Sequence, residues 1–147
     1  MISHDVDMIY WLFGKPQGGS ALSTERFDIV SAHYRYPDGK IINAQADLSL
    51  QGDVGFEMSY RVHAETATLV FKENRLTIYP KDGRAWVYEH SGDHGYYREI
   101  KYFANKLLSN GNIEISKPED SLITLQIAEA ERESALQSGA FVLLSAH

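Results

Sequence analysis

The spacing of apolar residues changes twice along the chain, from helical to strand-like and back to helical. Within the first fourteen positions, four apolar residues recur at helical spacing: Met8, Ile9, Leu12 and Phe13. Gly14 and Pro16 follow them, as a glycine and a proline commonly do after the last turn of a helix. The chain is therefore predicted to open with an amphipathic helix.

The middle of the chain alternates apolar and polar residues with the period of a β-strand. Residues 28–36 and 42–50 alternate on either side of a turn at Pro37, Asp38 and Gly39, which predicts a hairpin covered on one face. Four more strands are expected, over residues 56–62, 67–72, 75–80 and 84–89.

Helical spacing returns in the last third of the chain. One apolar stripe ends before Asn110 and consists of Ile100, Phe103, Ala104, Leu107 and Leu108. Ser116 and Glu119 have the spacing of a capping box, with Pro118 near the first turn, which predicts a helix over about residues 117–138. Residues 141–144 predict a last strand.

Together these elements predict an α+β fold with a mostly antiparallel open sheet of about six or seven strands and helices packed on one face. Residues 1–147 show no repeat, low-complexity segment or linker, so a single domain is expected. A chain of this length can bury roughly two-thirds of the surface that its unfolded form exposes. No disulfide is needed for stability, and the chain has no cysteine.

Charge and composition exclude several classes of function. The formal net charge is −6 and the fourteen basic residues are scattered, so no nucleic-acid partner is expected. No apolar run approaches the roughly 20 residues that span a bilayer, and the start of the chain does not read as a secretion signal. We expect no membrane partner and a cytoplasmic location. The absence of cysteine excludes thiolate metal sites and a cysteine nucleophile.

The polar residues of the first predicted helix supply candidate chemistry. His4 and Asp7 are three residues apart and are therefore neighbours on the helix surface. A histidine titrates near neutral pH and can exchange a proton with a substrate hydroxyl. The alternative for His4 is a structural role at the helix N-terminus. The alternative for Asp7 is an acidic residue favoured there by the helix dipole.

A polar segment before the second predicted helix offers weaker candidates. His90, Asp93 and His94 carry metal-ligating side chains, but no second group of ligands is readable nearby, so no metal site is expected. Tyr97 is a candidate substrate-binding residue because hydrogen-bonding groups at the end of a sheet suit a polyol site. The alternative is that Tyr97 is a core or interface aromatic.

The start of the chain resembles a known family of oxidoreductases. The C-terminal domain of the glucose-fructose oxidoreductase/inositol dehydrogenase/MocA (Gfo/Idh/MocA) family begins with the pattern Asp-x-x-x-His-x-x-Asp, an apolar helix, Leu and Gly. The residues that match are His4, Asp7, Leu12 and Gly14. The first Asp of the pattern would lie one residue before Met1, which implies a fragment of a longer protein.

Three later segments resemble the same family in the same order. Residues 62–71 resemble its Val-x-Gly-x-x-Gly-x-Leu hairpin, with Ala64 and Ala67 in place of the two glycines. Residues 97–103 resemble its Tyr-x-Glu helix start, and residues 118–142 resemble its closing helix and strand. The resemblance therefore covers nearly the whole chain.

The resemblance implies the C-terminal half of an NAD(P)-dependent dehydrogenase that acts by hydride transfer on a sugar, inositol or related polyol. It implies that His4 is catalytic. Asp7, one helical turn after His4, and Tyr97, next to the polar segment, are the candidate substrate-binding residues. NAD or NADP would be held by an N-terminal Rossmann domain that also carries a catalytic Lys. No cofactor is expected for this chain alone, since Gly18 and Gly19 open no βα unit and are interpreted as a turn.

Family members commonly pair through the open face of the sheet, so the resemblance favours a homo-oligomer. The more polar faces of the predicted strands carry His33, Arg35, Arg61 and His63. The alternative for these residues is a solvated sheet face. The alternative to a dehydrogenase half is a non-catalytic, stand-alone binding or scaffold module with the same fold.

Overall fold

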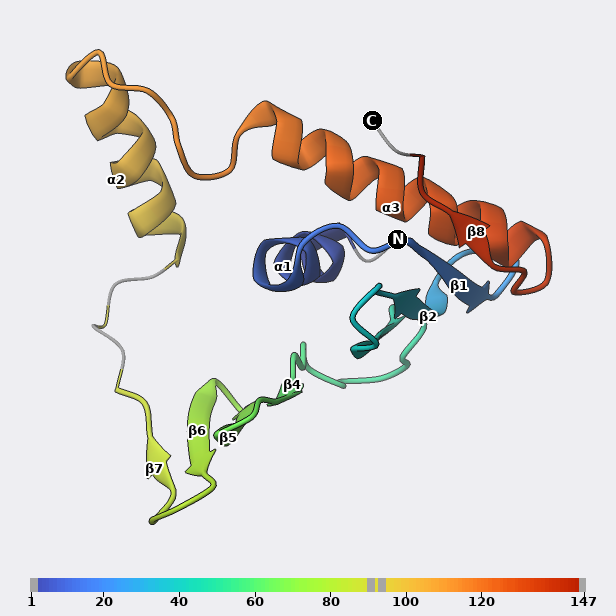
Figure 1. Cartoon of the computed structure of the whole chain (residues 1–147), viewed down its shortest axis with the longest axis horizontal. Helices are drawn as coiled ribbons and strands as arrows, with labels where there is room; N and C mark the ends of the chain where they lie inside the picture. Colours follow the sequence, from blue (N-terminus) through green and yellow to red (C-terminus); the bar gives the residue numbers. More distant parts are fainter. Residues whose placement is uncertain (1–2, 90–91, 93–94, 146–147) are drawn as a thin grey trace. The chain divides into compact units, whose positions relative to one another are not determined.

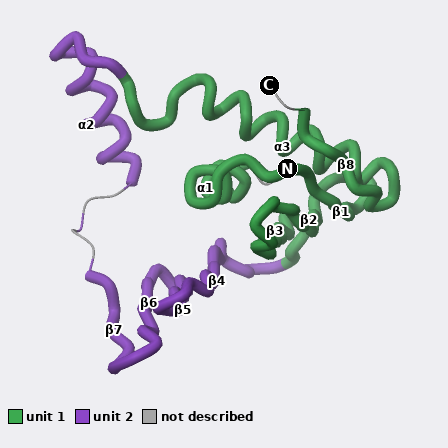
Figure 2. Tube along the Cα trace, in the orientation of Figure 1, with its two compact units in different colours: residues 1–51, 113–147 green, residues 52–112 purple. Residues whose placement is uncertain are grey.

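The computed structural model describes residues 3–89, 92 and 95–145 and divides the chain into two compact units. Unit 1 comprises residues 1–51 and 113–147, and unit 2 comprises residues 52–112 (Figure 2). Each unit is described by itself. In the described part of the chain, no helix is both long enough and apolar enough to span a membrane.

Unit 1 contains an antiparallel sheet with strand order β3-β2-β1-β8 and two helices (Figure 2). The strands are β1 (Gly18–Ser23), β2 (Ile29–Arg35), β3 (Ile41–Asp47) and β8 (Val142–Leu143). The helices are α1 (Ser3–Phe13) and α3 (Pro118–Leu136). The predicted hairpin around Gly39 is confirmed as the β2–β3 pair.

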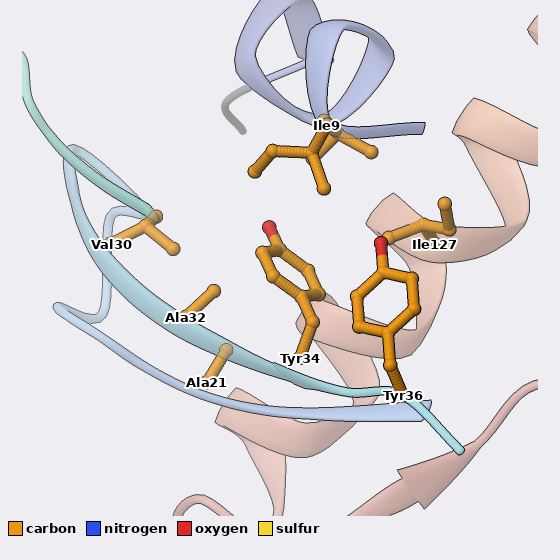
Figure 3. Packing of buried hydrophobic residues seen from close by; sticks show 8 residues of the cluster. Ile9, Ala21, Val30, Ala32, Tyr34, Tyr36 and Ile127 are labelled. Atoms are coloured by element: carbon orange, nitrogen blue, oxygen red, sulfur yellow. The ribbon is translucent and has the colours of Figure 1, made fainter. Parts of the chain in front are cut away.

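One face of this sheet is covered by α1 and α3, and the core lies between them (Figure 3). The buried cluster consists of Val6 and Ile9 of α1, Ile127 of α3, and Ala21, Val30, Ala32, Tyr34 and Tyr36 from the sheet segment. His33 and Arg35 alternate with the buried residues of β2 and are exposed. The predicted alternation of β2 is therefore confirmed, with helices on one face of this sheet.

Gly18 and Gly19 lie inside β1, so their interpretation as a turn was wrong. Both glycines are paired on two sides, with β2 and with β8. A Cβ atom on Gly18 would lie 2.2 Å from the carbonyl oxygen of Val142, and one on Gly19 would lie 2.9 Å from that of His33. Glycine is required here because neighbouring backbone approaches closely, which a single sequence does not distinguish from a turn.

Unit 2 contains a second antiparallel sheet with strand order β4-β5-β6-β7, followed by one helix (Figure 1). Its elements are β4 (Tyr60–His63), β5 (Ala67–Lys72), β6 (Arg75–Pro80), β7 (Trp86–Val87) and α2 (Gly95–Leu108). Glu73 and Asn74 both have positive φ (52° and 56°), as a two-residue hairpin turn requires. The bounds of β5 and β6 agree with the prediction.

The α+β class and the antiparallel pairing are confirmed, whereas the arrangement of strands differs from the prediction. The described residues form two sheets of four strands each instead of one sheet of six or seven. Strand β3 ends at Asp47 because the Asp47 carboxylate accepts hydrogen bonds from the amide and hydroxyl of Ser49, which turns the chain. Leu48, Leu50 and Phe56 continue the apolar alternation but are exposed.

Helix α3 begins one residue later than the predicted capping box implies. Lys117, not Ser116, is the N-cap residue, and its backbone N–H donates to Asp120 Oδ2 at 2.9 Å. Ser116 has a φ of +54°, outside the helical region. Pro118 then occupies the first turn, as predicted, where a missing N–H costs nothing.

Ser134 of α3 joins β1 to the chain that leads into β8. Its fully buried hydroxyl accepts a hydrogen bond from the amide of Ala21 at 2.8 Å and donates one to the carbonyl of Ala140 at 2.5 Å. The register of β8 on β1 covers Gly18 and Gly19 only. Ser134 therefore satisfies a backbone group of β1 that β8 does not reach.

We expect Ser134→Ala to lower the free energy of unfolding by about 1–3 kcal/mol, because it leaves a buried N–H without its acceptor. Urea denaturation measures this loss. The matched control is Ser121→Ala, on an exposed position of the same helix, which should change stability by less than about 0.5 kcal/mol. Equal effects of the two changes would contradict the role of Ser134.

Candidate functional site

The rotation of α1 about its axis is fixed by its apolar side, and this places His4 and Asp7 on the opposite side. Val6 and Ile9 are buried against the core, with exposed fractions of 0% and 6%. Positions 4 and 7 lie on the far side of a 3.6-residue helix from positions 6 and 9. His4 and Asp7 are accordingly exposed, and Trp11 lies on the same side with 76% exposure.

The carboxylate of Asp7 is anchored to α3. Thr124 is buried, and its Oγ1 donates a hydrogen bond to Asp7 Oδ1 at 2.8 Å. A second link between the helices joins the Tyr10 hydroxyl to Asp120 Oδ1 at 3.4 Å. Asp7 is thus held by a fixed partner on another element, and His4 lies one turn before it on the same face.

Two tyrosines of the β2 segment, Tyr34 and Tyr36, extend from the sheet into the core beneath the helices and form hydrogen bonds there. The hydroxyl of Tyr36 donates to the carbonyl oxygen of Gly14, at the end of α1, at 3.0 Å. The hydroxyl of Tyr34 donates to Glu131 Oε1 of α3. Figure 3 shows both rings extending from the sheet toward Ile9 and Ile127. The core between the sheet and the helices therefore contains polar groups, namely the two tyrosine hydroxyls and the Glu131 carboxyl.

Burial changes the acid–base properties of the groups in this layer. Burial raises the pKa of Glu131 to about 7, against the opposing effect of the Tyr34 hydrogen bond. Burial also raises the pKa of Tyr36 to about 12 and raises the pKa of Tyr34. The pKa of the Asp5 carboxyl is raised by its partial burial, with the charge of neighbouring His4 acting in the other direction.

Glu131, Thr124 and the polar roles of the two tyrosines are not among the residues that the sequence predicts for the site. Thr124, Ile127, Glu131 and Ser134 are all buried and recur at three- and four-residue spacing on α3. This spacing is the signal by which the sequence could have indicated that Glu131 is buried, because it places Glu131 on the same helix face as the core residue Ile127. Polar residues at such positions need partners from other elements, and sequence alone does not identify those partners.

Tyr97 lies in α2 of unit 2, whereas His4 and Asp7 lie in unit 1. Its side chain is 53% exposed, and the Lys101 ammonium lies 5.3 Å from the centre of its ring. The structure brings His4 and Asp7 together on one helix face, and the assignment of Tyr97 to the same site stays a prediction.

The weaker metal candidates His90, Asp93 and His94 lie outside the described residues. Over residues 3–89, 92 and 95–145, no three His, Cys, Asp or Glu side chains are grouped so that they could hold a metal ion.

The face of the unit 1 sheet that points away from the helices carries a shallow groove of about 310 Å³. Its lining includes Ser20, His33, Arg35, Ile41 and Phe141. The Arg35 guanidinium lies 4.1 Å from the centre of the Phe141 ring, and Ile41 is 91% exposed. This face combines positive charge with exposed apolar side chains.

Comparison with known proteins places this fold in a defined class. The family model described as "Oxidoreductase family, C-terminal alpha/beta domain" of the Gfo/Idh/MocA group matches residues 1–142. The chain therefore belongs to the Gfo/Idh/MocA oxidoreductase family and corresponds to its C-terminal α/β domain, as the resemblance implied. Curated proteins gave no match.

Solved structures share the fold at low sequence identity. A levoglucosan dehydrogenase in complex with NADH and levoglucosan is 16% identical with a TM-score of 0.78, over 99% of this chain and 49% of that one. The WlbA dehydrogenase from Bordetella pertussis, in complex with NADH and UDP-GlcNAcA, is 20% identical with a TM-score of 0.73, over 99% and 44%. An oxidoreductase from Thermotoga maritima is 17% identical with a TM-score of 0.80, over 96% and 45%. The chain thus spans about half the length of each.

The strand topology does not fit a dinucleotide-binding unit. Such a unit needs parallel strands joined through a glycine-rich loop and a helix whose N-terminus receives the pyrophosphate. Every strand pair in the described residues is antiparallel, and Gly18 and Gly19 are enclosed within β1. We assign no residue of this chain to NAD or NADP.

We expect the isolated chain to bind neither NAD nor NADP, since residues 3–89, 92 and 95–145 form no cradle for a pyrophosphate. Isothermal titration calorimetry with each dinucleotide measures this directly, and a dinucleotide-binding dehydrogenase serves as the positive control. A dissociation constant in the micromolar range would contradict the prediction.

Proposed function

We propose that this chain is the substrate-binding and oligomerisation half of an NAD(P)-dependent oxidoreductase that acts on a sugar, inositol or related polyol. The observation that carries the proposal is His4, exposed on α1 beside an Asp7 carboxylate that Thr124 anchors. Family membership supports the reaction class, and complexes of family structures with levoglucosan and with UDP-GlcNAcA support a sugar-like substrate.

His4 would manage the hydroxyl proton of the substrate. Oxidation of an alcohol carbon by hydride removal requires that the hydroxyl proton also leaves, and an imidazole can take it near neutral pH. The exposed position of His4 suits a residue that meets substrate at an open surface. In the full enzyme, NAD or NADP bound by a domain outside this chain would accept the hydride.

Asp7 and Tyr97 would bind the substrate by hydrogen bonding. A carboxylate accepts hydrogen bonds from sugar hydroxyls, and a phenol both donates and accepts them. The bond from Thr124 restricts the Asp7 side chain, so less conformational entropy is lost when substrate binds.

We expect His4→Ala, in the enzyme that joins this chain to its dinucleotide-binding domain, to lower turnover of the polyol substrate about a hundredfold or more. That is the usual scale for losing a positioned acid or base. Steady-state kinetics over a panel of sugars and inositols measures it. The exposed position of His4 predicts little change in stability.

His4→Gln separates proton transfer from hydrogen bonding. Glutamine can hydrogen-bond a hydroxyl but does not titrate, so His4→Gln should be as slow as His4→Ala. Recovery of turnover by glutamine would assign His4 to binding alone. Unchanged turnover in both variants would overturn the catalytic role of His4. The absence of any dehydrogenase activity would instead favour a non-catalytic binding or scaffold module.

We propose assembly through the exposed sheet faces, which carry the basic residues His33, Arg35, Arg61 and His63. An open sheet face of mixed charged and apolar character, such as that around Ile41 and Phe141, is suited to pairing with a second copy. The net charge of −6 makes a second copy an electrostatically suitable partner for these basic residues.

Light scattering at high protein concentration should give at least twice the monomer mass of 16.6 kDa. Charge reversal by Arg35→Glu or Arg61→Glu should weaken assembly, because a like charge would then meet the acidic partner. Arg26→Glu, at an exposed position between β1 and β2, is the control. A mass near that of the monomer would contradict assembly, and an assembly that tolerates both reversals would place the interface elsewhere.

A further inference from the structure

Glu131 is a buried carboxyl group on the core side of α3. It is only 6% exposed and follows Ile127 by one helical turn. Tyr34 donates a hydrogen bond to it from β2. No ion pair within the described part of the chain includes Glu131. An ionised carboxylate at this position therefore has no side-chain cation paired with it among the residues that the structure describes.

Three elements meet at this group. The Tyr34 ring belongs to the same buried cluster as Val6 and Ile9 of α1, so α1 rests on the side chain that hydrogen-bonds Glu131 (Figure 3). A cavity of about 10 Å³ lies beside both Tyr34 and Glu131. That volume admits about one water molecule, which is too little to hydrate a carboxylate.

The other titratable groups around this point are mostly acidic. Asp5 of α1 acts on both Glu131 and Tyr34 through its charge, and its own carboxyl is partly buried. Tyr36 is the remaining phenol of the layer, and His4 is next to Asp5 on the exposed side of α1.

We propose that Glu131 is a positioning residue that holds α1, and with it His4 and Asp7, against β2 and α3 in a protonation-dependent way. The neutral carboxyl shares a hydrogen bond with Tyr34 and is tolerated in the core. The carboxylate is poorly solvated and repels Asp5, so α1 loosens when Glu131 ionises. The proposal rests on the proposed function only in treating His4 and Asp7 as the site.

The direction of the pH dependence follows from the two states of Glu131. In the packed state its pKa is about 7, whereas an exposed glutamate has the ordinary value of 4.5. Between these values the packed state binds the proton and the open state does not, so packing weakens as pH rises. Below the pKa of an exposed glutamate, and above the pKa of Glu131 in the packed state, the ionisation of Glu131 no longer changes the packing with pH.

Amide hydrogen exchange of α1 tests the proposal without any assay of turnover. After correction for the intrinsic exchange rate, protection of α1 in the wild-type chain should fall on the order of tenfold between about pH 5.5 and about pH 8. Glu131→Gln keeps the shape and the hydrogen-bond acceptor but does not titrate, so it should abolish this fall. Glu133→Gln, an exposed carboxyl on the same helix, is the matched control and should retain it.

Tyr34→Phe gives a second, directional test. Because the Tyr34 hydrogen bond lowers the pKa of Glu131, its removal should move the transition in α1 protection to higher pH. If Glu131→Gln does not fold, carbon NMR of the Glu131 carboxyl in the wild-type chain replaces it, with a midpoint near 7 expected.

Three results would overturn the proposal: wild-type α1 protection that does not change with pH, an equal change in Glu131→Gln, or a carboxyl midpoint near the ordinary value. None of these measurements depends on His4 acting in catalysis. A failure of the catalytic assignment and a failure of the positioning role are therefore distinguishable.

Discussion

The packing of α1 against the unit 1 sheet is the constraint on which the candidate site depends. Val6 and Ile9 set the rotation of the helix, and the hydroxyl of Tyr36 holds its last turn through Gly14. Since a helix has one core side, fixing that side also fixes which residues face solvent. His4 and Asp7 are exposed for the same reason that Val6 and Ile9 are buried.

Polar groups inside the core determine how the elements fit together. Ser134 links α3 to β1, Thr124 links α3 to α1, and the Tyr34–Glu131 pair links β2 to α3. In the described residues, every buried side-chain nitrogen or oxygen has a hydrogen-bond partner. Apolar contact alone is non-directional, so these satisfied pairs are what specify one arrangement of α3 over the sheet.

The buried carboxyl of Glu131 gives this arrangement a chemical consequence. The apolar core residues of α3 do not titrate, so their packing does not depend on pH. A buried carboxyl group that is not paired with a side-chain cation destabilises the packing when it ionises. Helix α1 packs on the Tyr34 side chain that hydrogen-bonds Glu131, so the packing of the core and the presentation of His4 are coupled. The family membership of the chain defines its fold, whereas this coupling is a feature of its own residues.

The sequence by itself determined the elements whose signals are local. The periodicity of residues 67–80, the alternation around Tyr34 and the proline-initiated helix at Pro118 each follow from nearest neighbours along the chain, and the structure agrees with them. The spacing of His4 and Asp7 likewise placed them on one helix face. Their chemistry was inferred from family resemblance.

Only the tertiary structure decided the features that depend on distant segments. Gly18 lies in a strand because Val142 approaches it, and Thr124 anchors Asp7 across more than a hundred residues of sequence. Glu131 resembles a solvated charge until Tyr34 and the core enclose it. The physical reason is the same in each case. Burial and hydrogen-bond partners are determined by elements far apart in the chain, and local sequence patterns do not identify them.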